Sequence, residues 1–182
     1  YFEQALSTIA NRGIFDQLEG GFFRYTVDPK WEIPHFEKML YDNGQLLTLF
    51  ANGYKQFQNP LFKTRVYQTF AFLKKRMENS KGGFFAAIDA DNDEGEGRYY
   101  VFNSEEIKKV AGDDLLLCTD FYRINLDKPF EDSFFHLQQN KNPKGILEKF
   151  ALSEDELSKK RQGWEKQFEI IKQQREFPLI DN

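Results

Sequence analysis

The sequence has little sulfur and no long apolar run. Its 182 residues include two methionines and one cysteine, Cys118. A single cysteine cannot form an internal disulfide. Because Cys118 follows three leucines, we predict a buried core thiol without a redox role. No apolar run approaches the ~20 residues that a membrane-spanning helix needs, and no charged-then-apolar leader opens the chain, so the sequence predicts neither a membrane anchor nor a signal peptide.

Runs of one charge are also absent. Lysine and arginine total 25, aspartate and glutamate total 29, and the net charge of −4 is spread along the chain. Proteins that bind nucleic acid or anionic membranes usually carry clustered basic residues. The composition therefore predicts no nucleic-acid partner and no membrane partner.

What the sequence has in abundance is phenylalanine, with 20 residues. Most of them recur at helical spacing and predict the core faces of helices. Asn59 and Pro60 form a helix-start signal between the two longest patterns, which predicts an antiparallel pair of helices. The patterns as a whole predict helices over residues 2–17, 34–57, 60–80, 103–112, 114–122, 145–150 and 153–175.

Two segments with the sequence Gly-Gly-Phe-Phe, at residues 20–23 and 82–85, separate the helical patterns. The second segment and residues 98–102 flank an acidic loop, which predicts a small β-hairpin insertion. Residues 125–143 predict mostly loop with one short strand. This alternation of helices and glycine-rich loops is typical of stacked helix pairs, either a solenoid or a closed toroid, in a single domain.

Residues 20–45 carry more polar and aromatic groups than a connector needs, so we interpret them as the wall of a site. Because imidazole side chains in general can exchange protons near neutral pH, His35 is the candidate general acid or base, unless it only caps or packs. Asp42 lies seven residues further on, which predicts the same face of one helix. Candidate ligand-binding residues are Arg24, Tyr25, Trp31, Glu37, Tyr41 and Asn43, whose groups suit a polyhydroxylated ligand.

The acidic loop offers Asp89 and Asp91 as further catalytic candidates. Paired carboxylates can perform glycosidase-type acid and base chemistry, but the loop is equally readable as a solvated hairpin tip. It does not match a calcium-binding loop, because Glu94 replaces the turn glycine and Tyr100 replaces the bidentate glutamate. No other metal or dinucleotide motif is present, so the sequence predicts no metal and no cofactor.

Three stretches together carry a family resemblance: Gly-Gly-Phe-Phe-Arg-Tyr-Thr-Val-Asp at 20–28, Pro-His-Phe-Glu-Lys-Met-Leu-Tyr-Asp-Asn at 34–43, and 82–91 with the Glu-Gly-Arg-Tyr-Tyr-Val-Phe that follows. They resemble the YyaL-like, thioredoxin-domain-containing family, which includes the mammalian spermatogenesis-associated proteins. The resemblance implies a mainly α fold, an incomplete (α/α)6 toroid similar to the six-hairpin glycosidases and the N-acylglucosamine 2-epimerases. An upstream thioredoxin-like domain and further downstream hairpins are implied with it.

Two positions depart from the family pattern. Family members usually have His where this chain has Phe23, and Glu where it has Ile88, so two groups capable of proton transfer are replaced. The chain also begins at Tyr1 inside a predicted helix and without Met, so we expect residues 1–182 to be a fragment of the toroid domain. The compartment is left open, with the cytoplasm favoured.

These observations leave three hypotheses open. The first is a carbohydrate-related enzyme, a sugar isomerase, epimerase or glycoside hydrolase, that acts in a cavity lined by the glycine-rich loops. The second is a non-catalytic sugar- or peptide-binding module that serves a thioredoxin-like domain. The third is a structural role, in which Arg24, Asp42 and Asp89 form a buried ion network. An open arc of helices would need the remainder of its own chain, or self-association, to cover its apolar surface.

Overall fold

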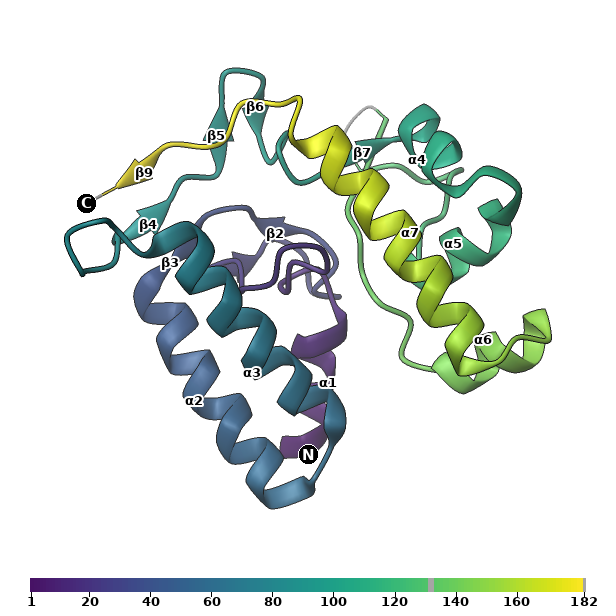
Figure 1. Cartoon of the computed structure of the whole chain (residues 1–182), viewed down its shortest axis with the longest axis horizontal. Helices are drawn as coiled ribbons and strands as arrows, with labels where there is room; N and C mark the ends of the chain where they lie inside the picture. Colours follow the sequence, from purple (N-terminus) through teal and green to yellow (C-terminus); the bar gives the residue numbers. More distant parts are fainter. Residues whose placement is uncertain (131–132, 182) are drawn as a thin grey trace.

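The computed structural model describes residues 1–130 and 133–181, and its helices fall into two groups (Figure 1). The first group contains α1 (Phe2–Asn11), α2 (Leu40–Phe57) and α3 (Pro60–Phe72), which a π-helical segment (Leu73–Met77) extends. The second group contains α4 (Ser104–Ala111), a 3-10 turn (Gly112–Asp114), α5 (Leu115–Tyr122), α6 (Pro143–Phe150) and α7 (Glu154–Lys172). The mainly helical class predicted from the sequence is confirmed. None of the helices in the described part of the chain is long and apolar enough to cross a membrane.

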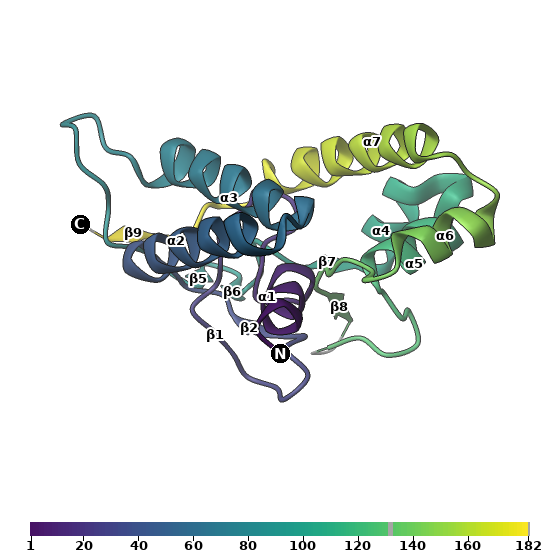
Figure 2. The ribbon, with the colours of Figure 1, turned by 90° about the horizontal axis from the view of Figure 1, so that it is seen from below.

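The predicted pair of long helices is present as α2 and α3, which lie side by side in both views (Figures 1 and 2). The side chain of Asn59 accepts a hydrogen bond from the Leu61 amide, and Pro60 occupies the first turn, as the sequence predicts. The start of α2 was predicted wrongly. The helix begins at Leu40 and not at Pro34, because residues 34–35 and 38–39 pair with other strands.

Short antiparallel strands connect the two groups. They are β1 (Tyr25–Thr26), β2 (Pro34–His35), β3 (Lys38–Met39), β4 (Ala87–Ile88), β5 (Asp91–Asn92), β6 (Gly95–Glu96), β7 (Phe102–Asn103), β8 (Phe134–Phe135) and β9 (Ile180–Asp181). They form the pairs β1–β2, β5–β6 and β7–β8, and a three-stranded sheet in the order β3–β4–β9. The β-hairpin predicted from residues 82–85 and 98–102 is wrong in its register. The hairpin lies inside the acidic loop as β5 and β6, and the flanking segments pair elsewhere.

The first helix also ends earlier than the periodicity predicts. It stops at Asn11 because Arg12 has an extended backbone, and the following Gly13 donates its amide hydrogen to the carbonyl of Trp31. A Cβ atom on Gly13 would lie only 2.0 Å from the carbonyl oxygen of Glu32, so the two backbone segments meet at a distance that only glycine permits. Phe15 and Phe22 then join the core between α1, α2 and α3.

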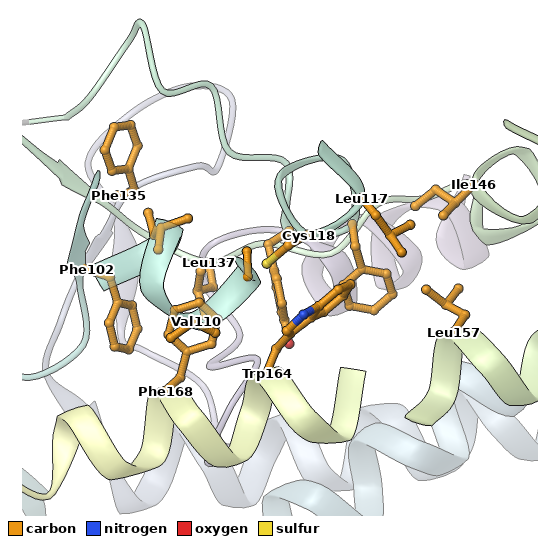
Figure 3. Packing of buried hydrophobic residues seen from close by; sticks show 14 residues of the cluster. Phe102, Val110, Leu117, Cys118, Phe135, Leu137, Ile146, Leu157, Trp164 and Phe168 are labelled. Atoms are coloured by element: carbon orange, nitrogen blue, oxygen red, sulfur yellow. The ribbon is translucent and has the colours of Figure 1, made fainter. Parts of the chain in front are cut away.

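The second group has its own core, in which side chains from α4, α5 and α7 interdigitate (Figure 3). In this view Trp164 of α7 points toward Cys118 and Leu117 of α5, and Phe168 of α7 points toward Val110 of α4. Cys118 is fully buried, as predicted, and burial raises the pKa of its thiol to about 12. The capping boxes predicted at Asn103 and Ser153 are both confirmed.

Candidate functional site

His35 lies on the short strand β2 and stacks against the ring of Tyr25 on the neighbouring strand β1. The two residues are paired in register, and their ring centroids are 4.9 Å apart at an interplanar angle of 20°. Since His35 precedes α2, the prediction that it shares a helix face with Asp42 is wrong. The strand pair nevertheless fixes the imidazole at a partly exposed position, where its side chain is 28% exposed.

Two carboxylates face the two nitrogens of this imidazole. His35 Nδ1 lies 2.7 Å from Glu96 Oε1, a hydrogen-bond distance, while Nε2 lies 3.8 Å from Glu37 Oε2. Glu37 is itself held by Arg24, whose Nη1 is 2.8 Å from Glu37 Oε2. One ring nitrogen is therefore fixed by a carboxylate, and the other is without a hydrogen bond among the described residues.

Asp42, in the first turn of α2, lies near the charges of Arg24 and Glu37. Burial, together with the nearby charge of Glu37, raises the pKa of Asp42 against the opposing effect of Arg24. Its Oδ2 atom is buried and has no hydrogen-bond partner in the described chain. Tyr41, beside it, is exposed. We call the set Arg24, Tyr25, His35, Glu37, Tyr41, Asp42 and Glu96 the His35 cluster.

Four candidates from the sequence lie outside the His35 cluster. Asn43 is fully buried, and its amide bonds the backbone N–H and C=O of Phe22 and the C=O of Met39. Asp89 accepts hydrogen bonds from the backbone amides that follow it, and Asp91 is exposed on β5. Trp31 lies on the loop between β1 and β2 with a left-handed backbone, φ 61°. The structure contains no hydrogen bond between any of these four side chains and His35 in its described part, and their functional roles stay predictions.

Sequence reasoning missed Glu96. The residue belongs to the acidic loop, but the prediction placed the hairpin around that loop and not within it. With Asp93 and Glu94 read as a two-residue turn, β5 and β6 would have paired Asp91 with Glu96, as they do in the structure. Its contact with His35, 61 residues away, is a tertiary feature that no local pattern predicts.

A second group of charged residues lies in the interior. We call Asp16, Glu19, Lys38, Arg76 and Lys172 the buried charge network. The amine of Lys38 lies 2.7 Å from Asp16 Oδ2, and the amine of Lys172 lies 2.8 Å from Glu19 Oε2. The lysine side chains are 0% and 2% exposed. Arg76 also pairs with Glu19 and completes the network.

The pKa values in this network follow from the competition between burial and opposite charge. Burial alone would raise the pKa of Asp16, but Lys38 and Lys172 outweigh it and hold the pKa well below its usual range. Burial opposes the same effect at Glu19, where Lys172 lowers the pKa to about 2. Burial and the neighbouring Lys172 lower the pKa of Lys38, against the attraction of Asp16. Both carboxylates are thus ionised near neutrality.

The structural hypothesis predicted a buried ion network of Arg24, Asp42 and Asp89, and this prediction is wrong. Arg24 is 43% exposed and pairs with Glu37, and neither Asp42 nor Asp89 joins a buried pair. The buried network instead connects Lys38 of β3 to Lys172 at the end of α7, so it links the two helical groups. Asp16, near both amines, lies between them.

The two positions that depart from the family pattern are in the core. Phe23 and Ile88 are each 0% exposed. The Phe23 ring packs against Phe36, Tyr100 and His136, and the amine of Lys38 lies 4.8 Å from its centroid. Neither position reaches the surface that carries the His35 cluster. In residues 1–130 and 133–181, no three His, Cys, Asp or Glu side chains are placed to hold a metal ion.

No protein-family model matches the chain. An uncharacterized protein of Caenorhabditis elegans is 30% identical over 154 residues, which are 80% of this chain and 21% of that protein. Human spermatogenesis-associated protein 20 is 32% identical over 121 residues, 63% of this chain and 15% of the human protein. The mouse protein of the same name is 34% identical over 111 residues, 58% of this chain and 14% of its own length.

These similarities support the resemblance to the spermatogenesis-associated family that the sequence motifs indicate. The chain spans about a fifth or less of the length of the curated relatives it matches. The name of the mammalian relatives describes an association and no reaction. What the site does must therefore be argued from its own chemistry.

Proposed function

We propose that the His35 cluster is one wall of a carbohydrate site, in which His35 transfers a proton to or from a hydroxylated substrate. The observation that carries this proposal is the contact of His35 Nδ1 with Glu96 Oε1 at 2.7 Å, while Nε2 has no hydrogen bond to any described residue. A carboxylate on one imidazole nitrogen fixes the tautomer and stabilises the imidazolium when the other nitrogen accepts a proton. Such a pair is a common arrangement of a general base and its orienting group.

The neighbouring side chains suit a sugar. The Tyr25 ring and the exposed Tyr41 offer flat apolar surfaces, and Arg24, Glu37 and Asp42 offer donors and acceptors to hydroxyl groups. Asp42 has a raised pKa and an oxygen without a hydrogen-bond partner among the described residues, which suits a second group for proton exchange. The reaction class that these groups support is isomerisation or epimerisation by proton transfer, with glycoside hydrolysis by a carboxyl pair as the neighbouring possibility.

The proposal is tested with the full protein and N-acetylglucosamine or mannose in D2O, with NMR to follow both product formation and deuterium incorporation. We expect His35→Gln to reduce the rate by roughly 100-fold or more, as loss of a general acid or base does. Lys108→Gln, at an exposed residue of α4 that pairs with Glu105, is the matched control and keeps the parent rate. Turnover that survives His35→Gln unchanged would remove His35 from the mechanism.

A second candidate function is a non-catalytic sugar- or peptide-binding module. The observation that favours it is that Phe23 and Ile88, both fully buried, carry no proton-transfer group at two positions where the resembled family usually has one. Calorimetry separates the two candidates. Sugar binding without turnover, abolished by Tyr25→Ala, supports the module and contradicts the enzyme.

We also propose that the α2–α3 pair is one hairpin of a larger helical toroid, and that the remainder of its own chain or a second copy covers the exposed side of the helices. The exposed aromatic residues Tyr67 and Phe70 on α3 support this proposal. A structure of the full protein in which α3 faces solvent would contradict it.

A further inference from the structure

A cavity of about 390 Å³ opens between residues 32–33, before β2, and residues 123–130 and 135–138. It shares no residue with the His35 cluster. Its lining, all from the described part of the chain, combines polar and aromatic side chains and includes Glu32, Arg123, Lys128, Phe130, His136 and Gln138. The volume is within the range of sites for small ligands.

Two cations in the cavity lining, Arg123 and Lys128, make no side-chain hydrogen bond to a described residue. Arg12 donates a hydrogen bond of 2.9 Å to Glu32 Oε1, so the one acidic side chain in the described lining already has a partner. Arg123 approaches Glu32 only to 3.7 Å and makes no side-chain hydrogen bond to a described residue. Lys128 likewise makes none. Burial, followed by the nearby charge of Arg12, lowers the pKa of Arg123 against the opposing effect of Glu32.

Two buried polar side chains in the wall have unused hydrogen-bonding capacity. Gln138 is 7% exposed, and its carbonyl oxygen accepts from Arg12 at 3.4 Å, while its amide nitrogen donates to no described residue. His136 is 9% exposed, and its Nε2 donates to the carbonyl of Gly13 at 2.8 Å. The other nitrogen, Nδ1, is buried without a partner in the described chain. Buried polar groups are normally satisfied, so the unmet Nδ1 of His136 in this wall indicates a polar occupant.

We propose that this cavity binds a small hydroxylated organic anion, with the acidic group on Arg123 and Lys128 and a hydroxyl group on the amide of Gln138. The guanidinium and the amine form charge-assisted hydrogen bonds to a carboxylate or phosphate. The amide N–H of Gln138 donates to the hydroxyl oxygen. Phe130 and Phe135 cover the apolar face of the ligand skeleton.

His136 serves as the reporter of binding and not as a charged ligand group. Burial lowers its pKa to about 4 against the opposing effect of its bond to Gly13, so the imidazole is neutral at pH 7. His35 is the other histidine among the 182 residues and belongs to the separate His35 cluster. Occupation of the cavity therefore changes the imidazole nitrogen shifts of His136 and leaves those of His35 in place.

The experiment titrates the 15N-labelled full protein at pH 7 with glucuronate, glucose 6-phosphate, inorganic phosphate and neutral glucose, with calorimetry in parallel. The variants are Arg123→Asn and Lys128→Gln. Asparagine at position 123 removes the cation and tolerates the left-handed backbone there, φ 56°. Lys55→Gln, at an exposed position of α2 away from the cavity, is the matched control.

We expect glucuronate or glucose 6-phosphate to shift His136 alone and to bind more tightly than inorganic phosphate or glucose. Each cavity variant weakens this binding by roughly tenfold or more, as loss of a charge-assisted hydrogen bond does, and Lys55→Gln does not. Glucuronate as the tighter of the two identifies a carboxylate, and glucose 6-phosphate a phosphate. Absence of binding by both organic anions, binding equal to that of inorganic phosphate, or affinity unchanged in Arg123→Asn would overturn the proposal. A shift of His35 alone would assign the ligand to the His35 cluster instead.

Discussion

The buried charge network and the His35 cluster contain the same kinds of side chain in opposite environments. In the network, the side chains of Lys38 and Lys172 are 0% and 2% exposed and their partners Asp16 and Glu19 are 6% and 5% exposed. In the cluster, Arg24 and Glu96 are 43% and 53% exposed. Ion pairs in water contribute little to stability, whereas an interior charge that loses its partner is costly. The comparison teaches that the buried network links the two helical groups, while charge changes in the partly exposed cluster should cost little stability.

The largest expected effect is at Lys38. Lys38→Ala leaves Asp16 buried opposite an empty space, so the free energy of unfolding should fall by about 3 to 5 kcal/mol. Denaturant unfolding measures this change. The control is Lys108→Ala, which removes an exposed lysine that pairs with Glu105 and should change stability little. An equal loss of unfolding free energy in the two variants would contradict the difference between buried and exposed ion pairs.

The next effect is pH dependence of stability, and it concerns His136. Its pKa is lowered from 6.5 to about 4 by burial, although Asp16 opposes this and Lys38 and Lys172 reinforce it. Between these values the unfolded chain binds more protons than the folded one, so stability falls as the pH decreases from about 6.5 to about 4. The loss from this group is about 3 kcal/mol. Thermal unfolding across this range in the parent and in His136→Gln measures it, and the variant should show a flatter profile. An identical profile would contradict the assignment.

Asn43 was predicted to bind a ligand, and its substitution tests whether it belongs to the binding site or to the protein interior. Asn43→Ala removes the amide that bonds the backbone N–H and C=O of Phe22, so unfolding should become easier by about 1 to 3 kcal/mol. Gln45→Ala, two residues away on the exposed face of α2, is the matched control. If Asn43→Ala weakened sugar binding while the melting temperature stayed unchanged, Asn43 would belong to the site and not to the interior.

The smallest effect on stability is expected at Glu96. Glu96→Gln changes a half-exposed contact with His35, so the free energy of unfolding should change by less than about 1 kcal/mol. Its effect on the proposed proton transfer should nevertheless be measurable, because the amide no longer stabilises the imidazolium. If Glu96→Gln lost much stability but no turnover, Glu96 would have the structural role that we assign to the buried charge network.

Local sequence patterns predicted most helices correctly because their causes lie within a few residues. The side chain of Asn103 caps the amide of Glu106, and Ser153 caps that of Glu156, both over three residues. The boundaries of α1 and α2 failed for the opposite reason. Gly13 meets the backbone of the loop before β2, and β2 and β3 occupy residues that would otherwise continue the periodic pattern of α2. Pairing with distant strands overrides local preference there.

The residues of the candidate site also divide into those placed by local sequence and those placed by distant segments. The motif at residues 34–43 placed His35, Glu37 and Asp42 near one another, since they are close in sequence. Asn43 also follows the motif, but its environment is decided by α2, whose packing directs the amide at the backbone of Phe22. No property of residue 43 alone distinguishes a ligand-binding amide from one that satisfies a buried backbone segment.

The sequence by itself determined the helical class, the helix caps, the buried thiol of Cys118 and the motif that carries the family resemblance. Only the tertiary structure decided that Glu96 reaches His35 across 61 residues and that Lys172 pairs with Glu19 across 153. It alone placed Arg123 and Gln138 in one cavity. The physical reason is range: helix periodicity and capping act between near neighbours, whereas the environment of a charged side chain is set by whichever distant segments the core brings beside it.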